Sequence, residues 1–224
     1  MDWRAHLERA RERYADGESR LPEAEDDDQR QRQLTRLGNA AYGAGLCALM
    51  IGDDEAARDW LARAAERYRE SFALAPPGSW GRPIGTIKAH VLAGDWDAAT
   101  AAAEWAVEAG AAESESPIGR YAACLALLVV GRDADARVLA DELRTLDDFP
   151  APVGDTLAMV AAGTDEVGYV LALQTVLESF ETREEYLEDV PVADTVLVLK
   201  ALGERRALAA ELSSPLLPAG ARTG

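Results

Sequence analysis

Residues 152–163 read PVGDTLAMVAAG and residues 191–203 read PVADTVLVLKALG, so nearly the same phrase occurs twice in this chain. Each copy begins with proline, which fits the first turn of a helix because the missing N–H would have had no partner there. Each copy ends with glycine, a residue that commonly terminates helices in the left-handed conformation. The apolar residues between these ends indicate a buried helix. The phrase therefore predicts an architectural repeat and contributes no chemistry itself.

Three earlier segments follow the same pattern and begin at residues 41, 83 and 117, so the five starts lie 34 to 42 residues apart. A small residue near each start would let a neighbouring helix approach closely. The glycines in this role are Gly43, Gly85, Gly119 and Gly154. The glycines expected to end the helices in the left-handed conformation are Gly52, Gly94, Gly131, Gly163 and Gly203.

Acidic residues often follow the closing glycine and precede a second, more polar helix. Asp53 and Asp95 are expected to cap these helices by accepting a hydrogen bond from a free N–H group. The predicted repeat consists of an inner helix, a tight Gly-Asp turn and an outer helix, and it recurs about every 34 residues. This pattern resembles the tetratricopeptide-repeat superfamily. The resemblance is best over residues 41–68, where small, turn and packing positions match Gly45, Gly52, Ala57, Leu61 and Ala64. It implies an all-α fold: an array of antiparallel helical hairpins that forms an α-solenoid or compact superhelix.

The predicted organisation has three parts. Residues 1–28 form an amphipathic helix, capped by Asp2, and an acidic linker that lacks the ligand order of a calcium-binding loop. Residues 29–212 form the helical-repeat domain of about five hairpins, and residues 213–224 form a flexible C-terminal tail. Within the repeat domain, the acidic side chains between residues 184 and 189 are expected on a short helix that ends at Pro191.

The charge balance argues against nucleic-acid binding. The chain has 40 Asp and Glu against 23 Lys and Arg and a formal net charge of -17, and its N-terminal arginines, Arg9, Arg11 and Arg13, alternate with Glu8 and Glu12. Only Lys88 and Lys200 are lysines, and this acidic, arginine-biased composition resembles that of proteins from salt-in halophilic archaea. An arginine-rich, high-GC genome is the alternative, although it does not explain the size of the charge.

Cys47 and Cys124 lie in apolar helical runs, so buried thiols are favoured over a disulfide or a metal pair. The N-terminal residues lack an apolar signal core, and the longest strongly apolar run, CLALLVV at 124–130, is too short to cross a bilayer. We therefore expect a cytoplasmic protein that neither enters a membrane nor carries a cofactor or metal.

The connection ESFALAPPGSWGRP at residues 70–83 interrupts the repeat and contains Trp80 and Arg82. An aromatic residue and an arginine on a rigid loop suit contacts with a partner. Alternatively, Trp80 folds back and covers the first two hairpins.

Polar residues also interrupt the inner helices. The candidates for binding a carboxylate or an acidic tail are Lys88 and His90 in the second repeat and Arg120 and Tyr121 at the start of the third repeat. The alternative is a solvated lysine and a capped histidine.

A conventional catalytic constellation is difficult to assemble. The chain has two histidines and lacks the metal, phosphate-loop and nucleophile motifs of common enzyme classes. Asp155 and Asp194 follow the Pro-Val start, where a carboxylate also complements the helix dipole. We therefore expect no enzyme.

Three functional hypotheses remain. The first is a protein-interaction module that binds an unidentified protein or peptide. The second is a small-molecule-binding regulator or enzyme with an all-helical pocket near Lys88, His90, Arg120 and Tyr121. The third is an acidic inhibitor or immunity-type protein that masks a basic effector.

Overall fold

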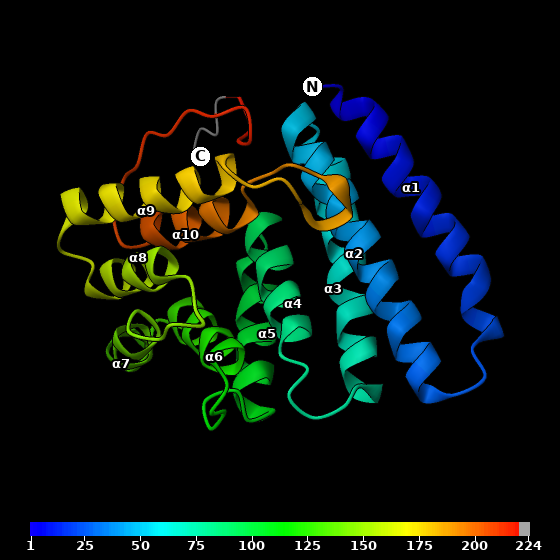
Figure 1. Ribbon diagram of the computed structural model, residues 1–224, viewed down its shortest axis with the longest axis horizontal. Helices are drawn as coiled ribbons and strands as arrows, with labels where there is room; N and C mark the ends of the chain where they lie inside the picture. Colours follow the sequence, from blue (N-terminus) through cyan, green and yellow to red (C-terminus); the bar gives the residue numbers. More distant parts are fainter. Residues whose placement is uncertain (220–224) are drawn as a thin grey trace. The chain divides into compact units, whose positions relative to one another are not determined.

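The computed structural model describes residues 1–219, and all regular structure in that range is helical (Figure 1). The α-helices are α1 (Trp3–Arg20), α2 (Asp27–Ile51), α3 (Asp54–Leu74), α4 (Gly81–Leu92), α5 (Trp96–Glu108), α6 (Pro117–Val129), α7 (Asp133–Leu143), α8 (Ala151–Ala162), α9 (Glu166–Glu181) and α10 (Asp194–Glu204). Two short 3₁₀ helices are η1 (Leu21–Glu23) and η2 (Leu187–Asp189). The predicted all-α class is confirmed for the described part of the chain.

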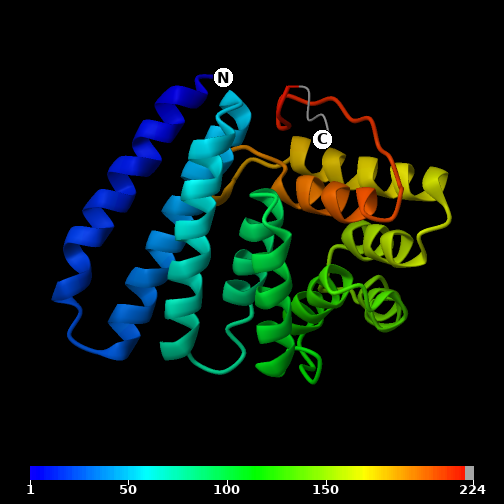
Figure 2. The same ribbon diagram turned by 180° about the vertical axis from the view of Figure 1, so that it is seen from behind.

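The chain divides into two compact units. The first contains Met1–Gly94, Glu184–Val192 and the segment that begins at Ser213, and the second contains Asp95–Arg183 and Ala193–Leu212. Within each unit, helices that follow one another in the chain pack side by side and reverse direction, as hairpins do. Both views of the ribbon show this for α1, α2 and α3 (Figures 1 and 2). The boundary falls in the turn between α4 and α5, so the second predicted hairpin gives one helix to each unit.

The N-terminal helix is longer than predicted. The Asp2 carboxylate accepts a hydrogen bond from the Ala5 N–H at 3.1 Å, which confirms the cap. The helix then continues through Arg20 into the segment predicted as linker, because Arg20 forms an ion pair with Asp16 at 2.9 Å and Gly17 is buried against Leu37. The non-helical linker is confined to the few residues between η1 and α2.

The turns between helices follow the local sequence closely. Asp53 accepts a hydrogen bond from the Ala56 N–H at 3.1 Å, and Asp95 accepts one from the Ala98 N–H at 3.0 Å, so both predicted caps are confirmed. The left-handed conformation is also confirmed at four of the five glycines predicted to adopt it, namely Gly52, Gly94, Gly131 and Gly163.

Gly203 is the exception, and the prediction for it is wrong. α10 runs through Gly203 to Glu204 with ordinary helical backbone. A Cβ atom at this position would lie 2.6 Å from Cζ of Tyr169, whose ring is fully buried. The glycine is therefore required by close packing between α10 and α9. Close approach is likewise seen at Gly85, where an added Cβ would lie 2.6 Å from the Tyr68 ring.

The segment between α9 and α10 belongs to the first unit and is not the short helix that was predicted. Its only helical turn is η2, in which Glu188 and Asp189 both have positive φ, at 56° and 57°. Arg13 of α1 donates to the Glu188 carbonyl oxygen at 2.8 Å and to the two carboxylates at 3.1 and 3.0 Å. Val190 is buried, so the chain stays extended past Pro191 and α10 begins only at Asp194.

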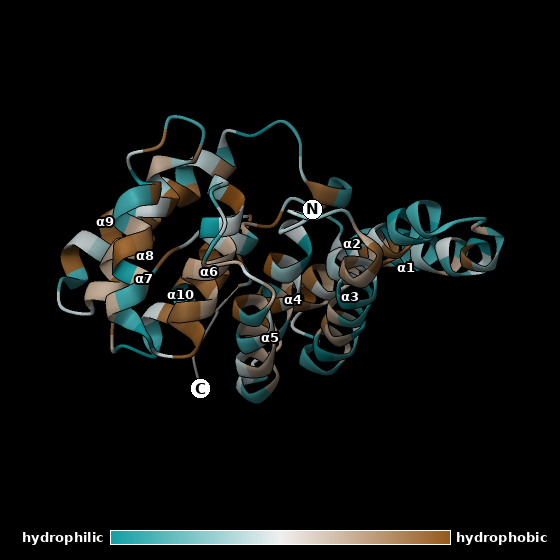
Figure 3. Ribbon diagram, turned by 90° about the horizontal axis from the view of Figure 1, so that it is seen from below, coloured by the Kyte–Doolittle hydropathy of each residue, from teal (hydrophilic) through white to brown (hydrophobic). Residues whose placement is uncertain are grey.

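The hydrophobic residues of each unit lie between its helices. In the second unit, the residues from Tyr121 to Val129 of α6 are all buried, and α10 is coloured largely brown in Figure 3. In the first unit, most of α1 is teal, because only one face of this helix packs against a neighbour. Leu216 and Leu217, within the predicted C-terminal tail, are buried, whereas residues 220–224 of that tail lie outside the described residues.

Candidate functional site

Trp80 lies at the start of α4 and packs within the first unit. Its side chain is 7% exposed, and its ring centroid lies 5.9 Å from that of Phe72 on α3. The connection from α3 therefore folds back onto the hairpin that it joins. In this arrangement Trp80 covers apolar surface and offers little area to a partner.

Arg82, two residues later, is half-buried in a polar network that joins three helices. Its Nε donates to the Ser71 hydroxyl of α3 at 2.8 Å, and its terminal amino group donates to the Gln31 side-chain oxygen of α2. The Gln31 amide nitrogen in turn donates to the Asp28 carboxylate at 3.0 Å. Gln31 and Ser71 are buried, so these bonds satisfy polar groups away from solvent.

Arg82 has neutral hydrogen-bond partners, Ser71 and Gln31, so no carboxylate among them balances its charge. Within residues 1–219 no carboxylate lies within ion-pair distance of its guanidinium. Burial lowers the Arg82 pKa, because desolvation disfavours the charged form. A partly buried cation with neutral partners is stabilised when an anion reaches it, so Arg82 is suited to receive a carboxylate.

Lys88 and His90 lie further along α4, also in the first unit. Lys88 is only 8% exposed, so the alternative of a solvated lysine is wrong. His90 is half-buried, and both side chains interact with neighbouring groups of the chain. Both lie on the helix that the repeat alignment predicted from residue 83, whereas Arg82, which was predicted on the preceding connection, lies in the first turn of the same helix.

Arg120 and Tyr121 are on α6 in the second unit. Arg120 forms an ion pair with Glu142 of α7 at 3.5 Å. Tyr121 is 8% exposed, its ring centroid lies 5.5 Å from that of Phe149, and burial raises the pKa of its hydroxyl. The six candidate residues are thus divided between the two units: Trp80, Arg82, Lys88 and His90 in the first, Arg120 and Tyr121 in the second.

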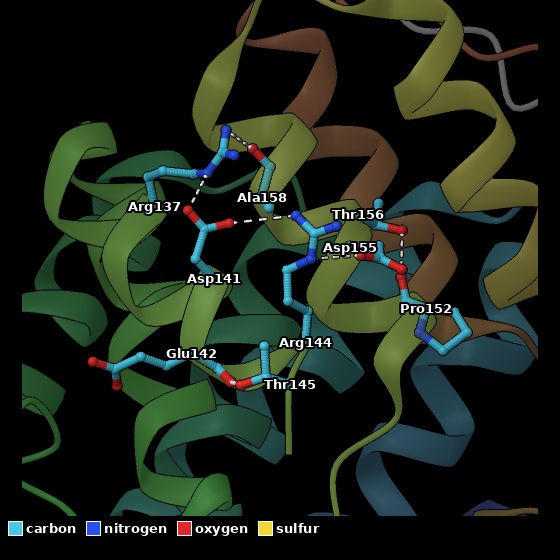
Figure 4. Close-up of polar contacts among 9 residues, drawn as sticks. All are labelled: Arg137, Asp141, Glu142, Arg144, Thr145, Pro152, Asp155, Thr156 and Ala158. Atoms are coloured by element: carbon cyan, nitrogen blue, oxygen red, sulfur yellow. Dashed lines mark hydrogen bonds and ion pairs between the residues drawn. The ribbon is translucent and has the colours of Figure 1, made fainter. Parts of the chain in front are cut away.

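Asp155, which follows the Pro-Val start of the repeated phrase, belongs to a chain of ion pairs between α7 and α8. Figure 4 shows Arg144 between two carboxylates, with Nε at 2.9 Å from Asp155 and a terminal nitrogen at 3.4 Å from Asp141. Arg137 donates to Asp141 at 2.8 Å and to the Ala158 carbonyl oxygen at 3.4 Å. The hydrogen bond from Arg137 lowers the Asp141 pKa, with Arg144 adding to the effect. This chain of pairs ties two helices together.

One cavity of the first unit lies where the predicted acidic linker meets the start of the predicted helical-repeat domain. It has a volume of about 350 Å³ and lies between the end of α1, η1 and the first half of α2. Its lining residues are Arg20, Glu23, Ala24, Gln29, Arg32, Gln33 and Arg36. Four of them share one face of α2, at spacings of three and four residues, and this periodicity is the signal that was available in the sequence.

Residues 1–219 give no support for a metal site, a disulfide or a membrane-spanning helix. No group of three or more His, Cys, Asp or Glu side chains in that range is placed to hold a metal ion. Cys47 lies in the first unit and Cys124 in the second, and both thiols are free and buried. None of the helices there combines the length and apolar character that a bilayer crossing requires.

Comparison of the whole chain with protein-family models, with curated proteins and with solved structures gives no match.

Proposed function

We propose that this chain is a non-catalytic protein-interaction module built from tetratricopeptide-like helical hairpins, and that it binds an acidic peptide segment of a partner protein at Arg82. Support for the hairpins comes from the consecutive helix packing within each unit and from the Asp-capped Gly-Asp turn between α2 and α3. The capped turn recurs because it lets the chain reverse within two or three residues.

The observation that carries the proposal is the electrostatic state of Arg82. Its guanidinium is held in place by Ser71 and Gln31, which leaves the planar group oriented before any ligand arrives. A carboxylate of the partner would meet a fixed, partly desolvated cation, and such charge-assisted hydrogen bonds are stronger than those between neutral groups. Trp80 contributes by fixing the connection that precedes Arg82.

The acidic composition is part of the same proposal. A formal net charge of -17 would repel most acidic peptides at low ionic strength. In a salt-rich cytoplasm this long-range repulsion is screened, while the short-range contact at a half-buried arginine is screened less. The interaction is therefore proposed for a salt-adapted cytoplasmic protein.

The test is affinity purification from native cytosolic extract of the source cell, read by mass spectrometry, with Arg82→Gln beside the unmodified chain. Arg30→Gln is the matched control, because Arg30 is exposed on α2 and has no side-chain partner within residues 1–219. We expect a partner that is retained by the control and lost with Arg82→Gln. Equal recovery with both variants would place the interaction elsewhere, and recovery of no partner by the folded chain would remove the proposal.

A further inference from the structure

The cavity beside η1 is lined by an unusual balance of charge for this chain. Carboxylates outnumber basic residues by 40 to 23 overall, yet the lining contains three arginines, Arg20, Arg32 and Arg36, and a single glutamate. Residues drawn at random from this chain would carry a net negative charge, whereas the lining carries a net positive charge. The arginines come from two helices, so the fold brings together cations that are separated in the sequence.

Gln29 and Gln33 hold in place the face of α2 that carries Arg32 and Arg36. The Gln33 side-chain nitrogen donates to the Gly17 carbonyl oxygen of α1 at 2.8 Å. The Gln29 side-chain oxygen accepts from the Glu25 N–H at 3.2 Å. These bonds join α2 to the end of α1 and to the turn, so the cavity is held open by the protein's own contacts.

The ion pairs around the cavity leave its positive charge available. Arg20 pairs with Asp16 and Arg32 pairs with Asp28, but each partner belongs to the same helix, and all four side chains are more than half exposed. Exposed pairs of this kind contribute little to stability, so an anion can compete for their arginines. Arg36 has no ion-pair or hydrogen-bond partner within residues 1–219.

The spacing of Arg32 and Arg36 adds a second argument. Like charges four residues apart on a helix repel each other and destabilise it. Nothing in the packing of α2 requires a cation at Arg36, which is exposed beside the cavity. An anion bound between the two guanidinium groups would reverse the sign of this interaction.

We propose that this cavity binds a small molecule through a phosphate group. The planar guanidinium group donates two parallel hydrogen bonds to two oxygens of a phosphate, a geometry that the ammonium group of a lysine does not offer. The volume of about 350 Å³ lies at the lower end of the range for small-molecule sites, which leaves room for a phosphate and a modest organic group. This site is distinct from Arg82 and does not depend on the proposed interaction with a partner.

The experiment is isothermal titration calorimetry with inorganic pyrophosphate, at a KCl concentration where circular dichroism shows the chain fully helical. The variants are Arg36→Gln, Arg36→Lys and the control Arg30→Gln, whose side chain is also exposed on α2 but does not line the cavity. We expect Arg36→Gln to weaken pyrophosphate binding at least tenfold and Arg36→Lys to weaken it less. The control should bind as the unmodified chain does.

Three results would overturn the proposal. The first is the absence of pyrophosphate binding to the folded chain, and the second is equal weakening by Arg30→Gln and Arg36→Gln, which would indicate attraction to charge alone. The third is tighter binding of citrate than of pyrophosphate, because a carboxylate ligand would then be favoured. Arg36→Gln, whose side chain takes no part in the Arg82 network, should leave recovery of the protein partner unchanged, so failure here and failure of the interaction proposal are separable.

Discussion

Replacing Gly203 with alanine tests the packing of α10 against α9. An added Cβ would lie 2.6 Å from Cζ of Tyr169, nearer still to its hydroxyl oxygen, and 3.1 Å from Cε2. The Tyr169 ring is fully buried, and its hydroxyl donates to the Leu199 carbonyl oxygen at 3.3 Å. The ring therefore has no open space into which it can move without losing its hydrogen bond.

The expected magnitude follows from three opposing contributions. Overpacking of a close-packed core costs about 1–3 kcal/mol, and a displaced hydroxyl loses about 0.5–1.5 kcal/mol of hydrogen bonding. Alanine in a helix interior recovers about 0.5–1 kcal/mol relative to glycine. We therefore expect Gly203→Ala to lower the free energy of unfolding by about 0.5–4 kcal/mol, with about 2 kcal/mol as the central value.

The assay is urea unfolding followed by circular dichroism, with the midpoint and slope compared between variants. Gly81→Ala is the control, since a Cβ at Gly81 would meet no heavy atom within 4 Å and its φ is not positive. We expect this control to change the unfolding free energy by less than about 0.5 kcal/mol. A Gly203→Ala variant as stable as the unmodified chain would refute the steric argument.

A double-mutant cycle sharpens the same prediction. Tyr169→Phe removes the oxygen that lies nearest to the added Cβ. The cost of Gly203→Ala should then fall by at least about 0.5 kcal/mol in the Tyr169→Phe background, because the two substitutions share one contact. Additive effects would show that the clash with the hydroxyl is not the source of the loss.

Three further predictions concern the charged and titratable groups. Arg13→Ala should speed amide hydrogen exchange in residues 184–192, because it removes the bonds that hold η2, whereas Arg9→Ala should not. Burial raises the pKa of Cys47 to about 11 and that of Cys124 to about 12. Only the unfolded chain then ionises its thiols just above pH 9, so urea stability should fall as pH rises from there, and less so when both cysteines are alanine. If the chain is salt-adapted, helical content and Tm should rise from dilute to molar KCl, and full stability in dilute buffer would contradict this.

Local sequence predicted the features that depend on a few neighbouring residues. Asp53 and Asp95 cap their helices because an aspartate before a helix satisfies a free N–H wherever it occurs. Gly52 and Gly94 adopt positive φ because the turn that follows each helix needs it. Such features are decided within one turn of chain, so they can be predicted before the tertiary structure is known.

The candidate site was less predictable, because its character depends on residues distant in sequence. The 70–83 connection is visible as an irregularity, but only the fold shows that Trp80 packs on Phe72. Arg82 acquires its significance from Gln31, which lies 51 residues earlier in the chain. The cavity beside η1 was missed because the acidic residues 23–28 suggested a solvated linker, and the arginines that line the cavity lie on either side of that acidic stretch and meet only in the fold.

The two copies of the repeated phrase show how tertiary contacts reassign identical local signals. Pro152 lies in the first turn of α8, whereas Pro191 precedes α10, because the residues around Pro191 pack in the first unit before the helix begins. Gly163 ends α8 in the left-handed conformation, while Gly203 continues α10 and makes room for Tyr169.

The phrase therefore specifies a buried helix in both places, but what packs against each copy decides where that helix begins and ends. Residues that the copies share are explained by this common demand for a thin, apolar helix. Functional specificity is then expected in the residues that no repeat requires, and both proposed sites meet this condition. Arg82 lies in the first turn of α4, at the end of the stretch that interrupts the repeat, and Arg36 lies before the first repeat, which begins at residue 41.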